Sequence, residues 1–274
     1  MNSLTDHESS SYAGREPFRG GEITKIFYLM IGLLLLSACA TSVSFQNAKL
    51  TEYDPPTEKI RGILAKPEGD GPFPAVVLLH TCGGVQRHVS RDWPAFLTEN
   101  GYAALTVDTF GSRNAGRCPA ARHLGGATMR RDAYGALDYL ASRPDIVPDQ
   151  IGVMGFSLGG RAIEAIAEQS IKSPEGRNFK AGIAFYGGCS VIRDPSFPVL
   201  EIIGRNDTNS YYCSRGSFKN WSVEILPGAY HAFDQPQITS MRTVSGGHSA
   251  IYDRTATNKS RELTRRFLDK NLAR

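Results

Sequence analysis

The feature that most constrains this chain is a Gly-Phe-Ser-Leu-Gly sequence centred on Ser157. An apolar run at 151–154 predicts a short buried strand before it, and residues 158–168 are predicted to form a helix after it. The two glycines are needed because strand and helix converge at this corner, where a Cβ on either side of the serine would collide with backbone. The free N–H groups of the first helical turn would face the serine hydroxyl. The pattern therefore predicts a nucleophilic serine in a tight, strained turn.

Three other interpretations of this motif are weaker. A five-residue pattern also occurs by chance, but here it lies between a predicted strand and a predicted helix. A dinucleotide-binding loop would need a glycine at the position of Ser157 and an acidic residue closing a strand about 20 residues later. A plain tight turn would not explain the spacing of two glycines around a serine.

The composition is that of a globular protein. With 274 residues the chain is long enough for one large α/β domain, and 41% hydrophobic with 21% charged residues is ordinary for a chain that buries a core. The formal net charge of +4 is not gathered into a dense Lys/Arg run, so we expect no nucleic acid partner.

The N-terminal region has the features of an export signal. Residues 26–36 are apolar and follow Lys25, but the run is shorter than the roughly 20 residues that span a bilayer. The run ends in Leu-Ser-Ala-Cys, which resembles a bacterial lipobox; an ordinary signal peptide or a short buried helix is the alternative. We therefore expect residues 25–39 to be a signal, Cys39 to be lipidated, and the protein to lie on the periplasmic side of the bacterial cell envelope, with the lipid anchor in a membrane.

The remaining chain divides at about residue 58. Residues 1–24 do not fit the short basic start of a signal, because four acidic residues accompany two arginines there, and we expect them to be disordered or untranslated. The polar stretch 40–57 is expected to be a tether, although 43–50 within it is a candidate strand. Residues 58–274 are expected to form the single folded domain.

Predicted strands alternate with predicted helices in that domain. Strands are predicted at 59–66, 75–79, 103–107, 151–154, 180–186, 199–203 and 222–226, and helices at 92–100, 128–142, 158–168 and 258–272. This alternation, with continuous apolar strands, is typical of a mostly parallel, doubly wound α/β sheet flanked by helices. Reacting groups collect at the carboxyl ends of the strands in such a sheet.

A nucleophilic serine needs an acid and a histidine base, which follow it in that order in α/β enzymes with this turn. Asp207 directly follows a predicted buried strand, whereas its rival Asp194 precedes that strand. His231 directly follows the next predicted strand, and its competitor His248 would otherwise line the same rim. We therefore predict Asp207 as the acid and His231 as the base.

The oxyanion of the reaction would be stabilised by two backbone N–H groups. Leu158 follows the nucleophile, and Cys82 lies in a His-Thr-Cys-Gly-Gly turn after the strand predicted at 75–79. Two glycines after a buried strand permit close approach of the backbone. We predict the N–H groups of Leu158 and Cys82 as the oxyanion hole.

These segments resemble the dienelactone hydrolase family of α/β-hydrolases, over most of the chain from Lys59 to the final helix. The matching segments are His80-Thr81-Cys82-Gly83-Gly84, Asp108-Thr109-Phe110-Gly111, Arg131-Asp132-Ala133-Tyr134-Gly135-Ala136-Leu137, Gly155-Phe156-Ser157-Leu158-Gly159-Gly160, Gly204-Arg205-Asn206-Asp207 and Tyr230-His231-Ala232-Phe233. The resemblance implies one α/β-hydrolase domain and a triad of Ser157, Asp207 and His231.

Two positions depart from the enzymes that gave the family its name. Those enzymes use a cysteine nucleophile and a glutamate in the oxyanion turn, where this chain has Ser157 and Thr81. Gln235 stands in the region of their carboxylate-binding arginine. The departures imply a substrate other than dienelactone, and we take Arg113 and Tyr186 as candidate substrate contacts.

The cysteines after the signal are Cys82, Cys118, Cys189 and Cys213, which allow three pairings in an oxidising compartment. We predict two disulfides, Cys82–Cys118 and Cys189–Cys213, because the two cysteines of each pair follow strands that are expected to be neighbours. Free buried thiols are the alternative. No C-x-x-C or His-rich spacing suggests zinc, and we expect neither a metal nor a cofactor.

The sequence thus predicts an exported serine hydrolase that cleaves a small carboxylic ester or lactone through an acyl-enzyme. One alternative is a peptidase of the prolyl-oligopeptidase type, although such enzymes usually carry a further domain. The other is a non-catalytic α/β-hydrolase fold used as a binding module of the cell envelope, which would not need a complete triad.

Overall fold

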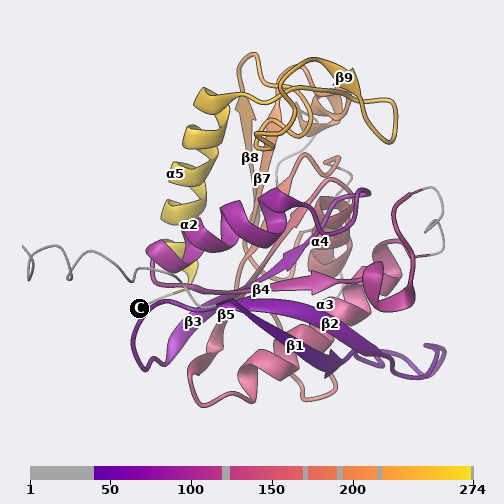
Figure 1. Cartoon of the computed structure of the whole chain (residues 1–274), viewed down its shortest axis with the longest axis vertical. Helices are drawn as coiled ribbons and strands as arrows, with labels where there is room; N and C mark the ends of the chain where they lie inside the picture. The colour runs from indigo at the N-terminus through magenta and orange to yellow at the C-terminus, as the bar shows by residue number, and fades with distance from the viewer. Residues whose placement is uncertain (1–39, 119–123, 169–171, 190–193, 215–217, 273–274) are drawn as a thin grey trace, which may run out of the picture. The chain divides into compact units, whose positions relative to one another are not determined.

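An eight-stranded sheet forms the centre of the computed structural model, which describes residues 40–118, 124–168, 172–189, 194–214 and 218–272 (Figure 1). Its strands are β1 (Thr41–Gln46), β2 (Lys59–Ala65), β3 (Phe73–Leu79), β4 (Ala103–Asp108), β5 (Ile146–Phe156), β6 (Gly182–Phe185), β7 (Val199–Gly204) and β8 (Trp221–Leu226). They are ordered β1-β2-β4-β3-β5-β6-β7-β8. Strand β2 is antiparallel to β1 and β4, and every other neighbouring pair is parallel. The predicted, mostly parallel α/β sheet is confirmed.

Helices cover both faces of this sheet. They are α2 (Trp93–Glu99) and α5 (Arg254–Asn271) on one face, and α3 (Gly126–Ala141) and α4 (Leu158–Glu168) on the other (Figure 1). Strand β3 shows why both faces are covered. Val77 and Leu79 pack with residues of α3 and α4, Val76 and Leu78 pack with residues of α2 and α5, and all four are fully buried. A strand that is apolar on both sides is stable only between two layers.

The last helix begins earlier than predicted. The side chain of Asp253 accepts a hydrogen bond from the Ala256 N–H at 2.9 Å, so the helix starts at Arg254 rather than near residue 258. An N-cap of this type satisfies one of the free N–H groups of the first turn. The helix predicted at 158–168 is confirmed as α4.

The first half of the predicted tether is part of the sheet, so the tether at 40–57 is wrong there. Strand β1 pairs along its length with β2, and only Phe45 of its residues is buried. The guanidinium of Arg131, in α3, donates to the carbonyl oxygens of Ala48 at 2.9 Å and Pro55 at 2.7 Å, which fixes the following loop to the domain. The candidate strand at 43–50 lies in this stretch, but the observed strand begins at Thr41 and ends at Gln46. An edge strand with one face in solvent has a polar sequence, which obscures its ends.

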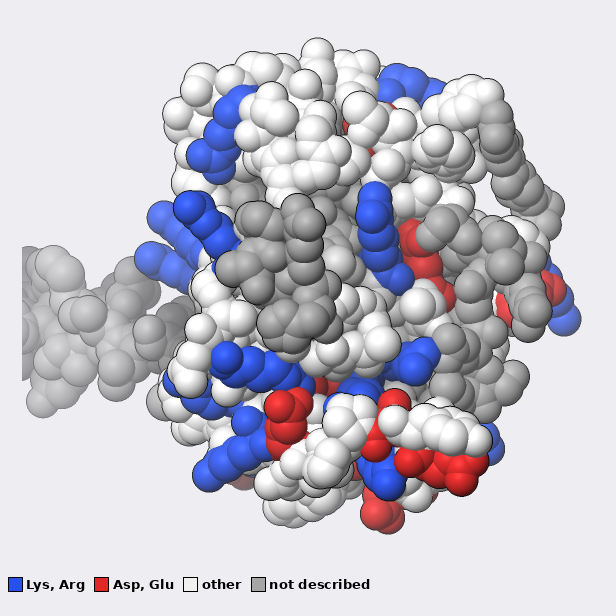
Figure 2. Space-filling model, turned by 90° about the vertical axis from the view of Figure 1, so that its right-hand side faces the viewer, with Lys and Arg blue, Asp and Glu red and all other residues white. Residues whose placement is uncertain are grey.

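Charged groups on the face shown in Figure 2 are mixed in sign. Lysine and arginine side chains lie among aspartates and glutamates in the lower half of that view and do not form one continuous basic tract (Figure 2). Ion pairs of the domain include Asp145 with Lys66 at 2.6 Å and with Arg143 at 2.9 Å.

Residues 1–39, which include the predicted signal and Cys39, lie outside the described residues. None of the helices in the described ranges is long and apolar enough to cross a bilayer.

Candidate active site

Ser157 lies at the corner between β5 and α4, where the sequence predicts it. Its φ of +54° is left-handed, a strained conformation for a residue with a side chain. A Cβ at Gly155 would collide with the carbonyl oxygen of Gly159, and a Cβ at Gly159 would collide with the carbonyl oxygen of Leu79. The Ser157 N–H donates to the carbonyl oxygen of Phe185 at 2.9 Å, which fixes the corner to β6. The glycines therefore allow the strand and helix to converge around the serine.

The structure brings a histidine and an aspartate to this serine. His231 Nε2 lies 3.0 Å from Ser157 Oγ, and His231 Nδ1 lies 2.5 Å from Asp207 Oδ2. An ionised carboxylate can only accept, so Nδ1 carries the proton and Nε2 is free to accept from the serine hydroxyl. The rival acid Asp194 is exposed and receives the Asn220 N–H at 3.4 Å. The three predicted side chains thus form one connected chain of hydrogen bonds, and their catalytic roles stay a prediction.

The loops that carry Asp207 and His231 are in direct contact. The Asn206 N–H donates to the carbonyl oxygen of Ala229 at 2.9 Å, and a Cβ at Gly204 would collide with that carbonyl. Gly204 is the last residue of β7, so its missing side chain lets the two loops touch at the carboxyl edge of the sheet. This contact sets the distance between acid and base.

Burial and hydrogen bonding determine the charges of this group. Burial by itself would raise the pKa of Asp207, but hydrogen bonds from His231, His248 and the Asn209 N–H hold the pKa well below its usual range. Burial is the main cause that lowers the pKa of His231, against the opposite effect of the Asp207 carboxylate. Asp207 is therefore ionised and His231 neutral near pH 7, as a base requires.

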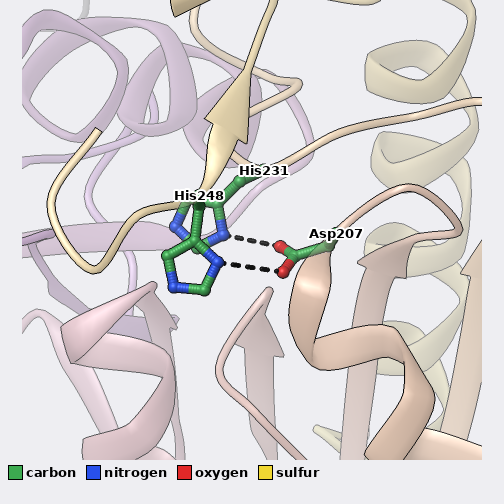
Figure 3. Close-up of side chains that lie close together, drawn as sticks. All are labelled: Asp207, His231 and His248. Atoms are coloured by element: carbon green, nitrogen blue, oxygen red, sulfur yellow. Dashed lines mark hydrogen bonds and ion pairs between the residues drawn. The ribbon is translucent and has the colours of Figure 1, made fainter. Parts of the chain in front are cut away.

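His248, the competitor of His231, also contacts the acid. Its Nδ1 lies 3.3 Å from Asp207 Oδ1, and its ring stacks on the ring of His231 with a centroid distance of 4.2 Å and an interplanar angle of 14° (Figure 3). The His231 ring also packs against the ring of Tyr186 at 4.6 Å. The structure thus places both histidines on one carboxylate.

Asp207, His231 and His248 are also the one group of three potential metal ligands found in the described ranges, with ligand atoms within 4.8 Å of one another. The geometry does not suit a metal ion. A metal ion bound by two imidazoles lies close to the plane of each ring, and two nearly parallel rings stacked 4.2 Å apart do not share such a position at the roughly 2.0–2.1 Å that zinc requires. A shared hydrogen-bonding carboxylate explains the cluster.

The predicted oxyanion turn lies beside the serine. Cys82 lines the same cavity as Ser157, and a Cβ at Gly159 would also collide with the carbonyl oxygen of His80, so the turn is in van der Waals contact with the start of α4. Thr81 shapes the turn by accepting the Gly83 N–H on its hydroxyl at 3.0 Å. The N–H groups of Leu158 and Cys82 therefore come from adjoining segments at the serine, and their role as oxyanion donors stays a prediction.

Both predicted disulfides are present. Cys82 pairs with Cys118 with a Cα–Cα distance of 5.2 Å, and Cys189 pairs with Cys213 with a Cα–Cα distance of 4.9 Å. The first joins the oxyanion turn to the loop after β4. The second joins the loop after β6 to the 3₁₀ helix at Thr208–Ser214, directly after Asp207. Each disulfide therefore holds a loop of the candidate site.

Ser157 and His231 open into a cavity of about 540 Å³. Its described lining is mixed in polarity and includes Gln86, Arg117, Gln235, Ile238, Arg242 and Val244. Two arginines and no acidic side chain are among the described lining residues, so the cavity is basic at its rim. Sequence reasoning missed both arginines, since neither lies at a predicted strand end.

The two predicted substrate contacts are wrong. Arg113 does not line this cavity; its guanidinium forms ion pairs with Asp132 at 2.8 Å and Glu58 at 2.7 Å, and its side chain is only 10% exposed. Tyr186 is fully buried and donates its hydroxyl to Asp234 Oδ1 at 2.7 Å. Burial raises the pKa of Tyr186 well above its ordinary value, so the hydroxyl stays a donor. Arg113 stabilises the fold, and Tyr186 supports the ring of His231 from inside.

Comparison with known proteins agrees with this geometry. The chain matches the Dienelactone hydrolase family over residues 60–272. It is 32% identical over 126 residues to "Putative hydrolase YtaP" of Bacillus subtilis, which covers 38% of this chain and 42% of that protein. It is 26% identical over 114 residues to "Putative carboxymethylenebutenolidase" of Synechocystis, which covers 37% of this chain and 46% of that protein. The matched stretch thus spans less than half the length of either relative.

Solved structures show the same fold. A dienelactone hydrolase-like promiscuous phosphotriesterase, P91, from metagenomic libraries superposes with a TM-score of 0.63 at 22% identity, covering 85% of this chain and 99% of that one. The match to the family covers most of the described chain, including all three residues of the hydrogen-bonded chain at the serine. This protein, an α/β-hydrolase in fold, belongs to the dienelactone hydrolase family.

Proposed function

We propose that this protein is a serine hydrolase that cleaves a small carboxylic ester or a lactone. The observation that carries the proposal is the hydrogen-bonded chain from Ser157 Oγ through His231 to Asp207 at the base of an open cavity. Family membership supports hydrolysis, and a relative named for action on a butenolide, an unsaturated lactone, supports the choice of an ester or lactone bond.

The reaction follows from the positions of the polar atoms. Ser157 Oγ attacks the carbonyl carbon while His231 Nε2 takes the hydroxyl proton, and the N–H groups of Leu158 and Cys82 stabilise the oxyanion. His231 then gives the proton to the leaving alkoxide oxygen, which departs as an alcohol and leaves an acyl group on Ser157. A water molecule then gives a proton to His231 and attacks the acyl carbonyl carbon. The bond to Ser157 Oγ breaks, the carboxylic acid leaves, and His231 returns the proton to Ser157 Oγ.

Covalent labelling tests the proposal most directly. A fluorophosphonate probe should label the purified protein once, on the peptide that contains Ser157, and labelling should abolish hydrolysis of p-nitrophenyl acetate. Labelling on another residue, or none together with no turnover, would reject the proposed function.

The pH dependence follows from the lowered pKa of His231. The base must be neutral to take a proton, so a pKa below the ordinary 6.5 keeps the enzyme active at lower pH. We expect the acid limb of kcat/KM for p-nitrophenyl acetate to have its midpoint below 6.5. A midpoint at or above 6.5 would contradict the environment described for His231.

We also propose that the enzyme is exported and held in the cell envelope by a lipid on Cys39. The apolar run before Cys39 supports this, and so do two disulfides, which persist in oxidising compartments. In a bacterial host that processes lipoproteins, the native protein should fractionate with membranes, and Cys39→Ala should remain uncleaved or move to the soluble envelope fraction. An unchanged membrane fraction with the native N-terminus for both proteins would contradict lipidation at Cys39.

A further inference from the structure

Two imidazoles bind the carboxylate of Asp207, although the proposed reaction uses only one. His231 takes Oδ2 and His248 approaches Oδ1, and the two rings lie face to face beside the carboxylate (Figure 3). His248 is 6% exposed and does not line the cavity in which Ser157 opens. Its position is therefore behind the base, away from the substrate.

The neighbours of His248 Nδ1 determine which atom carries the proton. Nδ1 lies 2.7 Å from Thr208 Oγ1 and 3.3 Å from Asp207 Oδ1. A lone pair on Nδ1 would face the negative carboxylate, whereas an N–H there can be shared between the carboxylate and the threonine oxygen. His248 therefore acts as a donor to Asp207.

The backbone holds His248 in this position. It lies in the turn between β9 (Arg242–Thr243) and β10 (Ser249–Ala250), and Val244 N–H donates to the His248 carbonyl oxygen at 2.9 Å. The carbonyl of Ser249 accepts the His231 N–H at 3.2 Å, so the hairpin is joined to the backbone of the base itself. A Cβ at Gly246 would come within 2.9 Å of the His248 ring, so the glycine leaves space for the imidazole.

We propose that His248 is a positioning residue for the base: it anchors Oδ1 of Asp207 and covers one face of the His231 ring, so that Nε2 stays directed at Ser157. The inference rests on the proposed serine hydrolase function. With Oδ1 held by His248 and the Asn209 N–H, the carboxylate cannot rotate, and Oδ2 keeps its alignment with His231. The stacked ring limits tilting of the His231 ring. Such tilting would break the 3.0 Å contact between His231 Nε2 and Ser157 Oγ.

Four titratable groups face His231, and together they determine how the pKa of His231 would change if His248 were removed. They are Asp207 on the loop after β7, His248 on the hairpin, Tyr186 after β6, and Asp234 in its own loop. Asp207 and Asp234 raise the pKa of His231, and His248 lowers it. Removing His248 therefore raises the pKa of His231 and moves the acid limb of kcat/KM to higher pH.

Three substitutions in the full-length protein separate the donor from the ring. His248→Ala removes both, and we expect kcat for p-nitrophenyl acetate to fall about 10- to 100-fold, the range for a lost hydrogen bond to a charged group, with KM within about threefold. His248→Asn keeps an N–H donor near the position of Nδ1 and should recover kcat to within about fivefold of native. His248→Phe keeps the flat ring without the donor and should fall between His248→Ala and His248→Asn.

The pH dependence of kcat/KM distinguishes a positioning role from a merely structural one, because loss of a structural contact alone would not shift its acid limb. The acid limb should shift to higher pH in His248→Ala and return toward native in His248→Asn, while Met241→Ala, an exposed change (47%) just before the same hairpin, should match native throughout. The role of His248 would be overturned by an unshifted acid limb or by native kcat in His248→Ala. It would also be overturned if all three variants lost activity equally and circular dichroism showed that they had unfolded. Native protein without Ser157-dependent turnover would overturn the proposed function and this role with it.

Discussion

Replacement of Ser157 by alanine is expected to lower kcat/KM for p-nitrophenyl acetate by about 10⁴-fold or more, the usual cost of removing a serine nucleophile. The physical reason is that Ser157 Oγ can both attack a carbonyl carbon and give its proton to His231 Nε2, which lies 3.0 Å away. What activity remains should come from the oxyanion donors and binding alone. Initial rates, corrected for the fraction of folded protein, measure the effect.

The matched control for that variant is Ser245→Ala. Ser245 also lines the cavity and is exposed, but it has no hydrogen bond to His231 among those in the described chain. The control should keep kcat/KM within about threefold, the small change usual for surface substitutions. Substantial turnover by Ser157→Ala, with Ser245→Ala equally impaired, would show that another group in the cavity performs the attack.

The second large effect is expected for Asp207→Asn. An asparagine at this position presents an NH₂ or a neutral carbonyl to His231 Nδ1, so the imidazole is no longer held with its proton on Nδ1 and its lone pair toward the serine. The analogous change in a serine protease lowers kcat about 10⁴-fold, and we expect a loss of about 10³- to 10⁴-fold here.

Asp194→Asn is the appropriate comparison for this variant. Asp194 was the rival acid by sequence position, and it is an exposed carboxylate that accepts a backbone N–H. We expect it to leave kcat unchanged within about threefold, in line with surface substitutions. If Asp194→Asn were the more damaging change, the acid identified from the geometry at His231 would be wrong.

The sequence was sufficient for the parts of the site that follow from the ends of buried strands. Ser157, Asp207 and His231 each directly follow an apolar strand or its short turn, and parallel strands bring such positions to one edge of the sheet. The disulfides could be predicted for the same reason, because their cysteines lie in loops after neighbouring strands.

Side-chain partners could not be predicted in this way. Arg113 follows a strand, as the members of the candidate site do, but two carboxylates from distant segments, Glu58 and Asp132, enclose it. Tyr186 ends a strand at the correct edge, yet its side chain turns into the core toward Asp234. Burial and ion pairing of this kind depend on contacts across many residues, which strand and helix periodicity does not describe.

Short and exposed elements were also missed. Strands β9 and β10 have two residues each, too few for an alternating pattern. The sequence pattern therefore predicts no element between the strand at 222–226 and the helix at 258–272, where the hairpin that carries His248 lies. One signal was available: Gly246 and Gly247, both with positive φ, form a glycine pair directly before His248, and such pairs mark tight turns.

The two disulfides give the candidate site a dependence on where the chain matures. One crosslink secures the turn that carries Cys82, the other secures the segment after Asp207, and both loops contribute groups to the reaction proposed here. Newly made protein in a reducing cytoplasm would lack both crosslinks, with its oxyanion turn and its acid on untethered loops. On the proposed export route, both loops would become tethered only on oxidative folding outside the cytoplasm.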